Sequence, residues 1–166
     1  FYALKNDGTV LGWPYNYAQG VTNVARLYSN EYNFVALKND GTVMWSGSST
    51  TNPLPSNLAN VVSIFTTVHA YAALKADGTA VTWGDSYGGD SSGVDLTNVA
   101  QIYSNYFGFA ALKSDSSVVA WGASSVSYSG ALTGVASICS TNGGFAALRT
   151  VGTVFQEPWL FSGTLR

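Results

Sequence analysis

The stretch FAALKSDSSVVAWG, residues 109–122, returns four more times along the chain in altered form. The other copies are YAALKADGTAVTWG (71–84), FVALKNDGTVMWSG (34–47), FYALKNDGTVLGW (1–13) and FAALRTVGTVFQE (145–157). Their shared leucines, at positions 4, 37, 74, 112 and 148, follow one another at intervals of 33 to 38 residues. A period in this range indicates a solenoid, a propeller or another repeat array.

A second phrase precedes each of the last four copies: NVARLYS (23–29), NVVSIFT (60–66), NVAQIYS (98–104) and GVASICS (134–140). The leucine or isoleucine of this phrase lies ten residues before the next repeat leucine every time. That constant spacing, set against linkers of variable length, indicates a rigid unit. We divide a single predicted domain into units 1 to 5, at residues 1–22, 23–59, 60–97, 98–133 and 134–166.

Each unit is predicted to form a first strand, a second strand, a tight turn and a third strand, followed by a loop with room for a fourth strand. Asp-Gly between two β-rich runs is a strong hairpin pattern, and it occurs at Asp7-Gly8, Asp40-Gly41 and Asp77-Gly78. Glycine supplies the positive φ, and the aspartate can accept local backbone N–H bonds. We expect the turns at Asp115-Ser116 and Val151-Gly152 to be looser or of another type.

The composition limits the class of protein. Hydrophobic residues make up 46% of the 166 residues, enough for a core, and only 10% are charged. Abundant aromatic, glycine and hydroxyl residues favour β-structure, and no sustained helical period is present. A net charge of -2 argues against nucleic-acid binding, and no apolar run is long enough for a membrane span. Cys139 alone can form neither an internal disulfide nor a metal site.

The pattern ALKxDGTVxxWG, with WGDSYGGD at 83–90, resembles the repeat of the regulator of chromosome condensation family. The resemblance implies a β-propeller of four-stranded blades, commonly seven in that family. For this chain the repeats predict an all-β fold, a β-propeller of short three- to four-stranded blades with about five repeat units. The units are shorter than those of the family's eukaryotic founding member, and the glycine-rich loop is clear only in unit 3. A solenoid of strands is the second interpretation.

The two ends of the chain bear on closure of the ring. Unit 1 starts at its second strand, and the tail LFSGTLR (160–166) has no place in the repeat. Closed rings often let one terminus complete the blade that the other begins, which removes exposed strand edges. We therefore predict that residues 160–166 supply a strand to unit 1. The alternative is that the chain forms part of a larger propeller.

Five of the seven basic residues share one repeat position: Lys5, Lys38, Lys75, Lys113 and Arg149. The first four precede an aspartate by two residues, so we predict an exposed ion pair in each unit, worth about 0 to 1 kcal/mol. A cationic ring that binds an anion is the alternative. Arg149 faces Val151 in the repeat and is the candidate for an unpaired cation.

We predict no catalytic residue, metal site or cofactor. His69 takes a repeat position held elsewhere by Tyr32 and Phe107, and Cys139 replaces an aromatic residue. Both substitutions point to packing or surface roles. Three aspartates lie in GDSYGGDSSGVD, but their spacing of five does not match the alternating ligands of an EF-hand calcium loop. These three are Asp85, Asp90 and Asp95.

Aromatic residues in or near the loops are the candidates for binding a partner, because rigid aromatic area on a fixed scaffold suits protein recognition. The predicted partner-binding residues are Tyr15, Tyr17, Tyr87, Tyr106, Tyr128 and Trp159. Aromatics that recur within the repeat are predicted to fill the wedges between units, and the tryptophans that end third strands to be core. The first set is Tyr28, Phe65 and Tyr103, and the second is Trp13, Trp83 and Trp121.

These observations favour a non-enzymatic protein-binding or structural module, a subunit or domain of a larger assembly. The family resemblance also implies protein partners. The repeat is similar in style to that of a bacterial β-lactamase inhibitor. A lectin-like carbohydrate binder is the alternative, although its repeated sites would require similar loops and these loops differ. Nucleotide exchange on a nuclear GTPase is disfavoured by charge and size. The composition slightly favours an extracellular or cell-surface location over an organelle, but no Asn-x-Ser/Thr sequon is present.

Overall fold

The computed structural model describes residues 1–13, 20–30, 33–46, 54–56, 58–85, 88–123, 128–150 and 160–161. Within these ranges the regular secondary structure consists of β-strands only, and all strand pairs are antiparallel. The all-β prediction is therefore confirmed. The strands form five small sheets, and each sheet is built from consecutive strands of one unit.

The sheets follow the predicted order of first, second and third strand. Unit 1 contains β1 (Tyr2–Leu4) and β2 (Val10–Gly12), and unit 2 contains β3 (Val24–Ser29), β4 (Phe34–Lys38) and β5 (Val43–Ser46). Unit 3 contains β6 (Val61–Thr66), β7 (Ala70–Lys75) and β8 (Ala80–Gly84). Unit 4 contains β9 (Val99–Ser104), β10 (Gly108–Lys113), β11 (Val118–Gly122) and a fourth strand, β12 (Tyr128–Leu132). Unit 5 contains β13 (Val135–Ser140), β14 (Phe145–Arg149) and β15 (Leu160–Phe161).

The Asp-Gly turns form as predicted. In unit 1 the Gly8 N–H donates to the Lys5 carbonyl at 3.0 Å, and the Lys5 N–H donates to the Thr9 carbonyl at 2.9 Å. Gly8 has a φ of 77°, which fits a turn that closes on a left-handed residue. The Asp7 carboxylate accepts the Thr9 N–H at 2.9 Å. The aspartate thus stabilises the turn from inside.

The turn at Asp115-Ser116 is not looser, contrary to the prediction. Ser116 adopts the left-handed conformation with a φ of 66°, and its N–H donates to the Lys113 carbonyl at 2.9 Å. The Asp115 carboxylate accepts the N–H of Ser117 at 2.9 Å and its hydroxyl at 2.6 Å. Because the aspartate bonds are kept, they hold the turn although serine is strained there. Val151-Gly152 lies outside the described residues.

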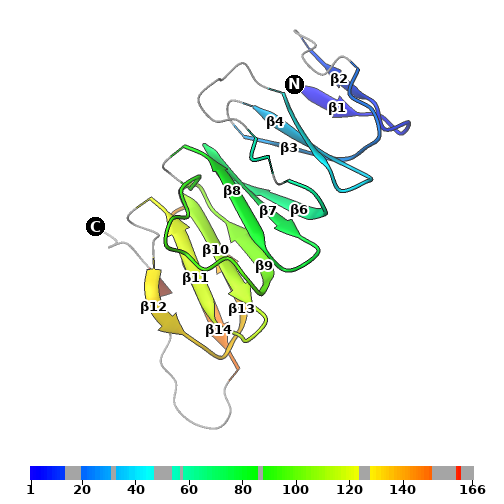
Figure 1. The fold of residues 1–166 in the computed structure, drawn as a ribbon. Helices are drawn as coiled ribbons and strands as arrows, with labels where there is room; N and C mark the ends of the chain where they lie inside the picture. The colour runs from blue at the N-terminus through cyan, green and yellow to red at the C-terminus, as the bar shows by residue number, and fades with distance from the viewer. Residues whose placement is uncertain are drawn as a thin grey trace.

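The five sheets follow one another in a row, with β1–β2 at one end and β13–β14 at the other (Figure 1). The hairpin turns of units 1 to 4 are each bonded to the unit that follows. The first valine of units 2 to 5 donates its N–H to the carbonyl of the last turn residue in the preceding unit. These bonds are Val24–Gly8 at 3.0 Å, Val61–Gly41 at 2.9 Å, Val99–Gly78 at 2.7 Å and Val135–Ser116 at 3.0 Å.

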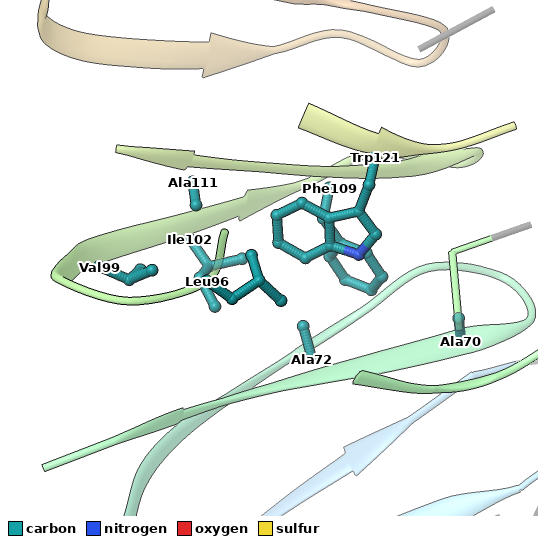
Figure 2. Packing of buried hydrophobic residues seen from close by; sticks show 8 residues of the cluster. All are labelled: Ala70, Ala72, Leu96, Val99, Ile102, Phe109, Ala111 and Trp121. Atoms are coloured by element: carbon teal, nitrogen blue, oxygen red, sulfur yellow. The ribbon is translucent and has the colours of Figure 1, made fainter. Parts of the chain in front are cut away.

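The core lies in the junctions between units and not within single sheets. Figure 2 shows the junction of units 3 and 4, where Ala70 and Ala72 of β7 face Phe109 and Trp121 of β10 and β11. The Phe109 and Trp121 rings stack at 5.4 Å, and the Trp121 indole N–H donates to the Gly88 carbonyl of unit 3 at 3.2 Å. Each unit therefore needs a neighbour to bury its apolar face.

The recurring aromatics fill these junctions, as predicted for Tyr28, Phe65 and Tyr103. All three are half-buried and pack against clusters that combine their own unit with the next. The prediction for the tryptophans that end the third strands holds for Trp83 and Trp121 but is wrong for Trp13. The Trp13 side chain is 48% exposed, because among the described residues no further unit covers that side of unit 1.

The tail does not complete unit 1 in the way predicted. Leu160 and Phe161 form β15, which pairs with Ala146 and Phe145 of β14 in the same unit. A nearby strand is the easier partner, because closing a short loop costs less conformational entropy than closing a long one. Residues 162–166 lie outside the described residues.

Candidate interaction surface

The four loops that join first and second strands share one hydrogen-bonded frame. We call them the tip loops; they comprise residues 30–33, 67–70, 105–108 and 141–144. In each loop the backbone N–H of the first residue donates to the carbonyl of the fourth, at 2.9 to 3.1 Å. The backbone therefore closes in the same way in units 2 to 5.

A side chain fixes each frame from within. The first residue of every tip loop is asparagine or threonine, and its side-chain oxygen accepts the backbone N–H of the fourth. These bonds are Asn30–Asn33 at 2.9 Å, Thr67–Ala70 at 2.9 Å, Asn105–Gly108 at 2.9 Å and Thr141–Gly144 at 3.1 Å. Thr67 and Asn105 are buried, so the bases of these two loops belong to the folded scaffold.

The two central residues of each tip loop differ in every unit. The pairs are Glu31-Tyr32, Val68-His69, Tyr106-Phe107 and Asn142-Gly143. Glu31 and Tyr32 lie outside the described residues. A constant frame with variable central residues is typical of a surface that is adapted for recognition.

The pair in unit 4 is the most apolar of the described tips. Tyr106 is 47% exposed and Phe107 is 39% exposed, and their rings meet at 62° with centroids 4.8 Å apart. The side-chain oxygen of Asn105 also accepts the Phe107 N–H at 2.8 Å. The Tyr106 N–H donates to the Asn142 carbonyl at 3.4 Å, which connects this tip to that of unit 5. Two exposed rings are thus held on a fixed loop.

Of the six predicted partner-binding residues, Tyr106 is the one whose side chain the structure describes, and it is exposed. Tyr128 begins β12 opposite Ala120, while its side chain lies outside the described part. The other four lie outside it entirely: Tyr15, Tyr17, Tyr87 and Trp159. Phe107 was not among the predicted partner-binding residues. The asparagine or threonine that follows each first strand in the sequence could have identified the tip loops.

His69 occupies the tip of unit 3 and lies beside an acid. Its Nδ1 is 3.7 Å from the Asp85 carboxylate, and both side chains are partly exposed. Asp85 follows β8 directly, so the third strand and the tip loop of the same unit meet here. The pair therefore places polar groups beside Val68 on the tip of this unit.

The opposite edge of the units carries the Asp-Gly turns and the basic residues. Lys5–Asp7 at 3.3 Å forms the predicted exposed ion pair. Lys75–Asp77 at 3.6 Å also forms, but the Lys75 side chain is only 19% exposed. In the part of the chain that the structure describes, the predicted pair of Lys38 with Asp40 is not formed. Lys113 departs from the prediction, because it lies 2.6 Å from Asp95. Among the described residues, no carboxylate pairs with Arg149.

Hydrogen bonds hold the turn aspartates in their charged form. The hydroxyl and N–H of Thr9 and the nearby Lys5 lower the pKa of Asp7 to about 2. Equivalent hydrogen bonds from Thr42 and Thr79 lower the pKa of Asp40 and Asp77, respectively. Lys113, followed by the hydroxyl and N–H of Thr97, lowers the pKa of Asp95 to about 2. The aspartates at this edge therefore have local structural partners.

The aspartates of the glycine-rich loop are spread over separate contacts. Asp90 accepts the Ser92 N–H at 2.8 Å, while Asp85 lies by His69 and Asp95 by Lys113. In the ranges that the structure describes, no group of three His, Cys, Asp or Glu side chains could hold a metal ion. The described residues also form no helix of the length and hydropathy that a membrane crossing requires.

No protein-family model matches the chain, and no curated protein matches its sequence.

Proposed function

We propose that this chain is a non-catalytic protein-binding module and that the tip loops contact the partner. One observation carries the proposal: four loops share a hydrogen-bonded frame, while their two central residues vary. Catalysis requires particular chemical groups at fixed positions, whereas recognition of a partner needs a rigid frame with varied contacts. Tyr106 and Phe107 supply the exposed aromatic area that anchors protein interfaces.

We further propose that the units are blades of a propeller related to the regulator of chromosome condensation repeat. The first strands of successive units contact one another, β3 with β6, β6 with β9 and β9 with β13. Inner strands of neighbouring blades are expected to do so. Protein partners are a property that this resemblance implies.

The test removes the aromatic tip and follows binding in an extract of the native source. The double variant Tyr106→Ala/Phe107→Ala should lose a protein that the unaltered chain retains in quantitative affinity purification. The matched control is Val62→Ala, which trims an exposed apolar side chain on β6 away from the tips. Both changes are at the surface and should alter folding stability by about 0.5 kcal/mol or less.

Two results would contradict the proposal. Retention of the same proteins by the tip variant and the control would show that the aromatic tip makes no contact. Binding on a glycan array that disappears with the tip variant would favour a lectin-like function, in which the aromatic rings stack on sugars.

A further inference from the structure

The tip loop of unit 5 contains Asn142 followed by Gly143, and no other asparagine in the 166-residue sequence precedes a glycine. Both residues are exposed, and they are the central pair of the loop. An asparagine side chain can be attacked by the backbone nitrogen of the next residue. Glycine favours this attack, because it has no Cβ to obstruct it. Whether the reaction proceeds in the folded chain depends on the bonds that the two groups make.

The described part of the chain leaves both reacting groups free. Among the described residues, neither the Asn142 side chain nor the Gly143 N–H takes part in a hydrogen bond. The bonds that close this loop join Thr141 to Gly144 and do not involve these two groups. A Cβ at Gly143 would have no atom within 4 Å apart from its chain neighbours. The Asn142 amide can therefore turn toward the Gly143 nitrogen without breaking a bond or displacing a neighbour.

The Asp-Gly turns could form the same cyclic imide, but their groups are held in hydrogen bonds. In each of the three turns the glycine N–H donates to the carbonyl of the lysine three residues earlier, at 3.0 to 3.1 Å. The aspartate carboxylate accepts the N–H of the threonine two residues later, at 2.9 Å. A charged carboxylate is also a poor target for a nucleophile. The structure therefore protects Asp7-Gly8, Asp40-Gly41 and Asp77-Gly78 and leaves Asn142 open to attack.

We propose that Asn142 is a site of spontaneous deamidation. The Gly143 nitrogen attacks the Asn142 Cγ and closes a cyclic imide, and the side-chain nitrogen leaves as ammonia with the proton that Gly143 loses. Water then opens the ring. Breaking the Cγ–N bond gives aspartate, and breaking the bond between the nitrogen and the Asn142 main-chain carbonyl carbon gives isoaspartate. One water is consumed and one ammonia is released, and the reaction does not depend on the proposed function of the tip loops.

Both products place a carboxylate next to the aromatic tip of unit 4. The Tyr106 N–H donates to the Asn142 carbonyl at 3.4 Å, so the two tips are in contact. Isoaspartate also adds a methylene group to the main chain. This lengthens a loop that is closed by bonds of 2.9 and 3.1 Å between Thr141 and Gly144. Deamidation therefore changes the charge and the backbone of the surface beside Tyr106 and Phe107.

The main test follows the tryptic peptide 114–149 by mass spectrometry while the 166-residue chain is incubated at neutral and at mildly alkaline pH. This peptide contains Asn142 as its only asparagine and contains no glutamine, so an exchange of amide for acid within it is located at Asn142. We expect two products of equal mass, aspartate and isoaspartate, which chromatography separates. They should form faster at the higher pH, because the attacking nitrogen must lose its proton.

The synthetic peptide STNGGFA, identical to residues 140–146 and blocked at both ends, gives the rate without tertiary structure. Because the fold leaves the two groups free, the folded chain should react within about tenfold of this peptide, a difference in barrier of about 1.4 kcal/mol at most. A folded chain that reacts more slowly than this range would show that the fold protects Asn142. That result would overturn the proposal.

The matched variant is Gly143→Ala, which adds only a methyl group. Gly143 lies outside the left-handed region and has open space around it, so the variant should keep the melting temperature of the unaltered chain. Its Cβ obstructs the attack and should slow deamidation at least about tenfold. Equal rates in the variant and the unaltered chain would overturn attack by the Gly143 nitrogen.

The effect on unit 4 is measured by amide NMR on the purified isoaspartate form. The Tyr106 resonance should shift, because the carbonyl that accepts its N–H becomes part of a carboxylate. The Lys75 resonance, at the opposite edge, should not move. The variant Asn142→Asp keeps the peptide carbonyl and should shift the Tyr106 resonance less. An unchanged Tyr106 resonance in the isoaspartate form would overturn the link between the two tips.

Discussion

Units 1 and 4 carry equivalent pairs of stacked aromatic rings that differ in their exposure to solvent. In unit 4, Phe109 and Trp121 stack at 5.4 Å and are nearly inaccessible, because unit 3 covers them. In unit 1, Phe1 and Trp13 stack at 5.7 Å but are 85% and 48% exposed. The local strand pair creates the stack, and the neighbouring unit decides whether it becomes core.

The largest effect expected from this comparison is the loss of the buried ring. Trp121→Ala should lower the free energy of unfolding by about 3 to 5 kcal/mol, because it leaves a cavity between units 3 and 4. Trp13→Ala should cost less than about 1 kcal/mol. Urea denaturation of both variants measures the difference, and equal losses would show that the junction does not carry the stability.

Close backbone approach between β7 and β8 within unit 3 should give the next largest effect. A Cβ at Gly84 would lie 2.5 Å from the Ala70 Cα and 2.6 Å from the His69 carbonyl oxygen, at a φ of 125°. Gly84→Ala should therefore cost about 2 to 3 kcal/mol. Gly93 also has a positive φ, but a Cβ there would have no atom within 4 Å apart from its chain neighbours. Gly93→Ala should therefore cost about 1 kcal/mol. Thermal denaturation compares them, and a similar cost for both would contradict the crowding at Gly84.

The lysine–aspartate pairs of the molecule also differ in their burial. Lys113 is 8% exposed and depends on Asp95, whereas Lys5 beside Asp7 is largely solvated. Asp95→Asn should therefore destabilise the fold more than Asp7→Asn at pH 7, because it leaves a buried ammonium group without its partner. Urea denaturation at pH 7 measures this difference.

The pH dependence of the same variants provides a second check. The pKa of Asp95 is lowered to about 2, so its stabilising contribution is complete above about pH 4 and is lost as the pH falls toward 2. The gap between the unaltered chain and Asp95→Asn should shrink over that range. A gap that stays constant between pH 7 and pH 2 would exclude the charged pair as its cause.

The turns offer the smallest expected effect. Ser116 is a non-glycine residue at a φ of 66°, where the other units have glycine. Ser116→Gly should raise the free energy of unfolding by up to about 1 kcal/mol. Gly78→Ser should lower it by about as much, because a Cβ at Gly78 would meet its nearest atom at 3.6 Å and leave only the backbone strain. Opposite shifts in melting temperature would confirm that the turns are equivalent, and shifts of the same sign would contradict it.

The fold could be predicted from sequence to the extent that it is local. The strands, the Asp-Gly turns and the division into sheets follow from patterns within a few residues of each other. The predicted wedge positions of Tyr28, Phe65 and Tyr103 also hold, because the repeat places them at equivalent junctions. The candidate site could be predicted less well, since exposed Tyr106 was included and Phe107 beside it was not.

The sequence by itself determined what neighbouring residues can decide: which runs are strands, where the chain turns, and that units repeat. The tertiary structure alone decided that Trp13 is exposed, that Lys113 pairs with Asp95, and that Leu160–Phe161 join their own unit. The physical reason is that burial and ion pairing depend on what lies across a junction. A repeat unit has the same local sequence preferences at every position, but its neighbours differ between the middle and the end of the row.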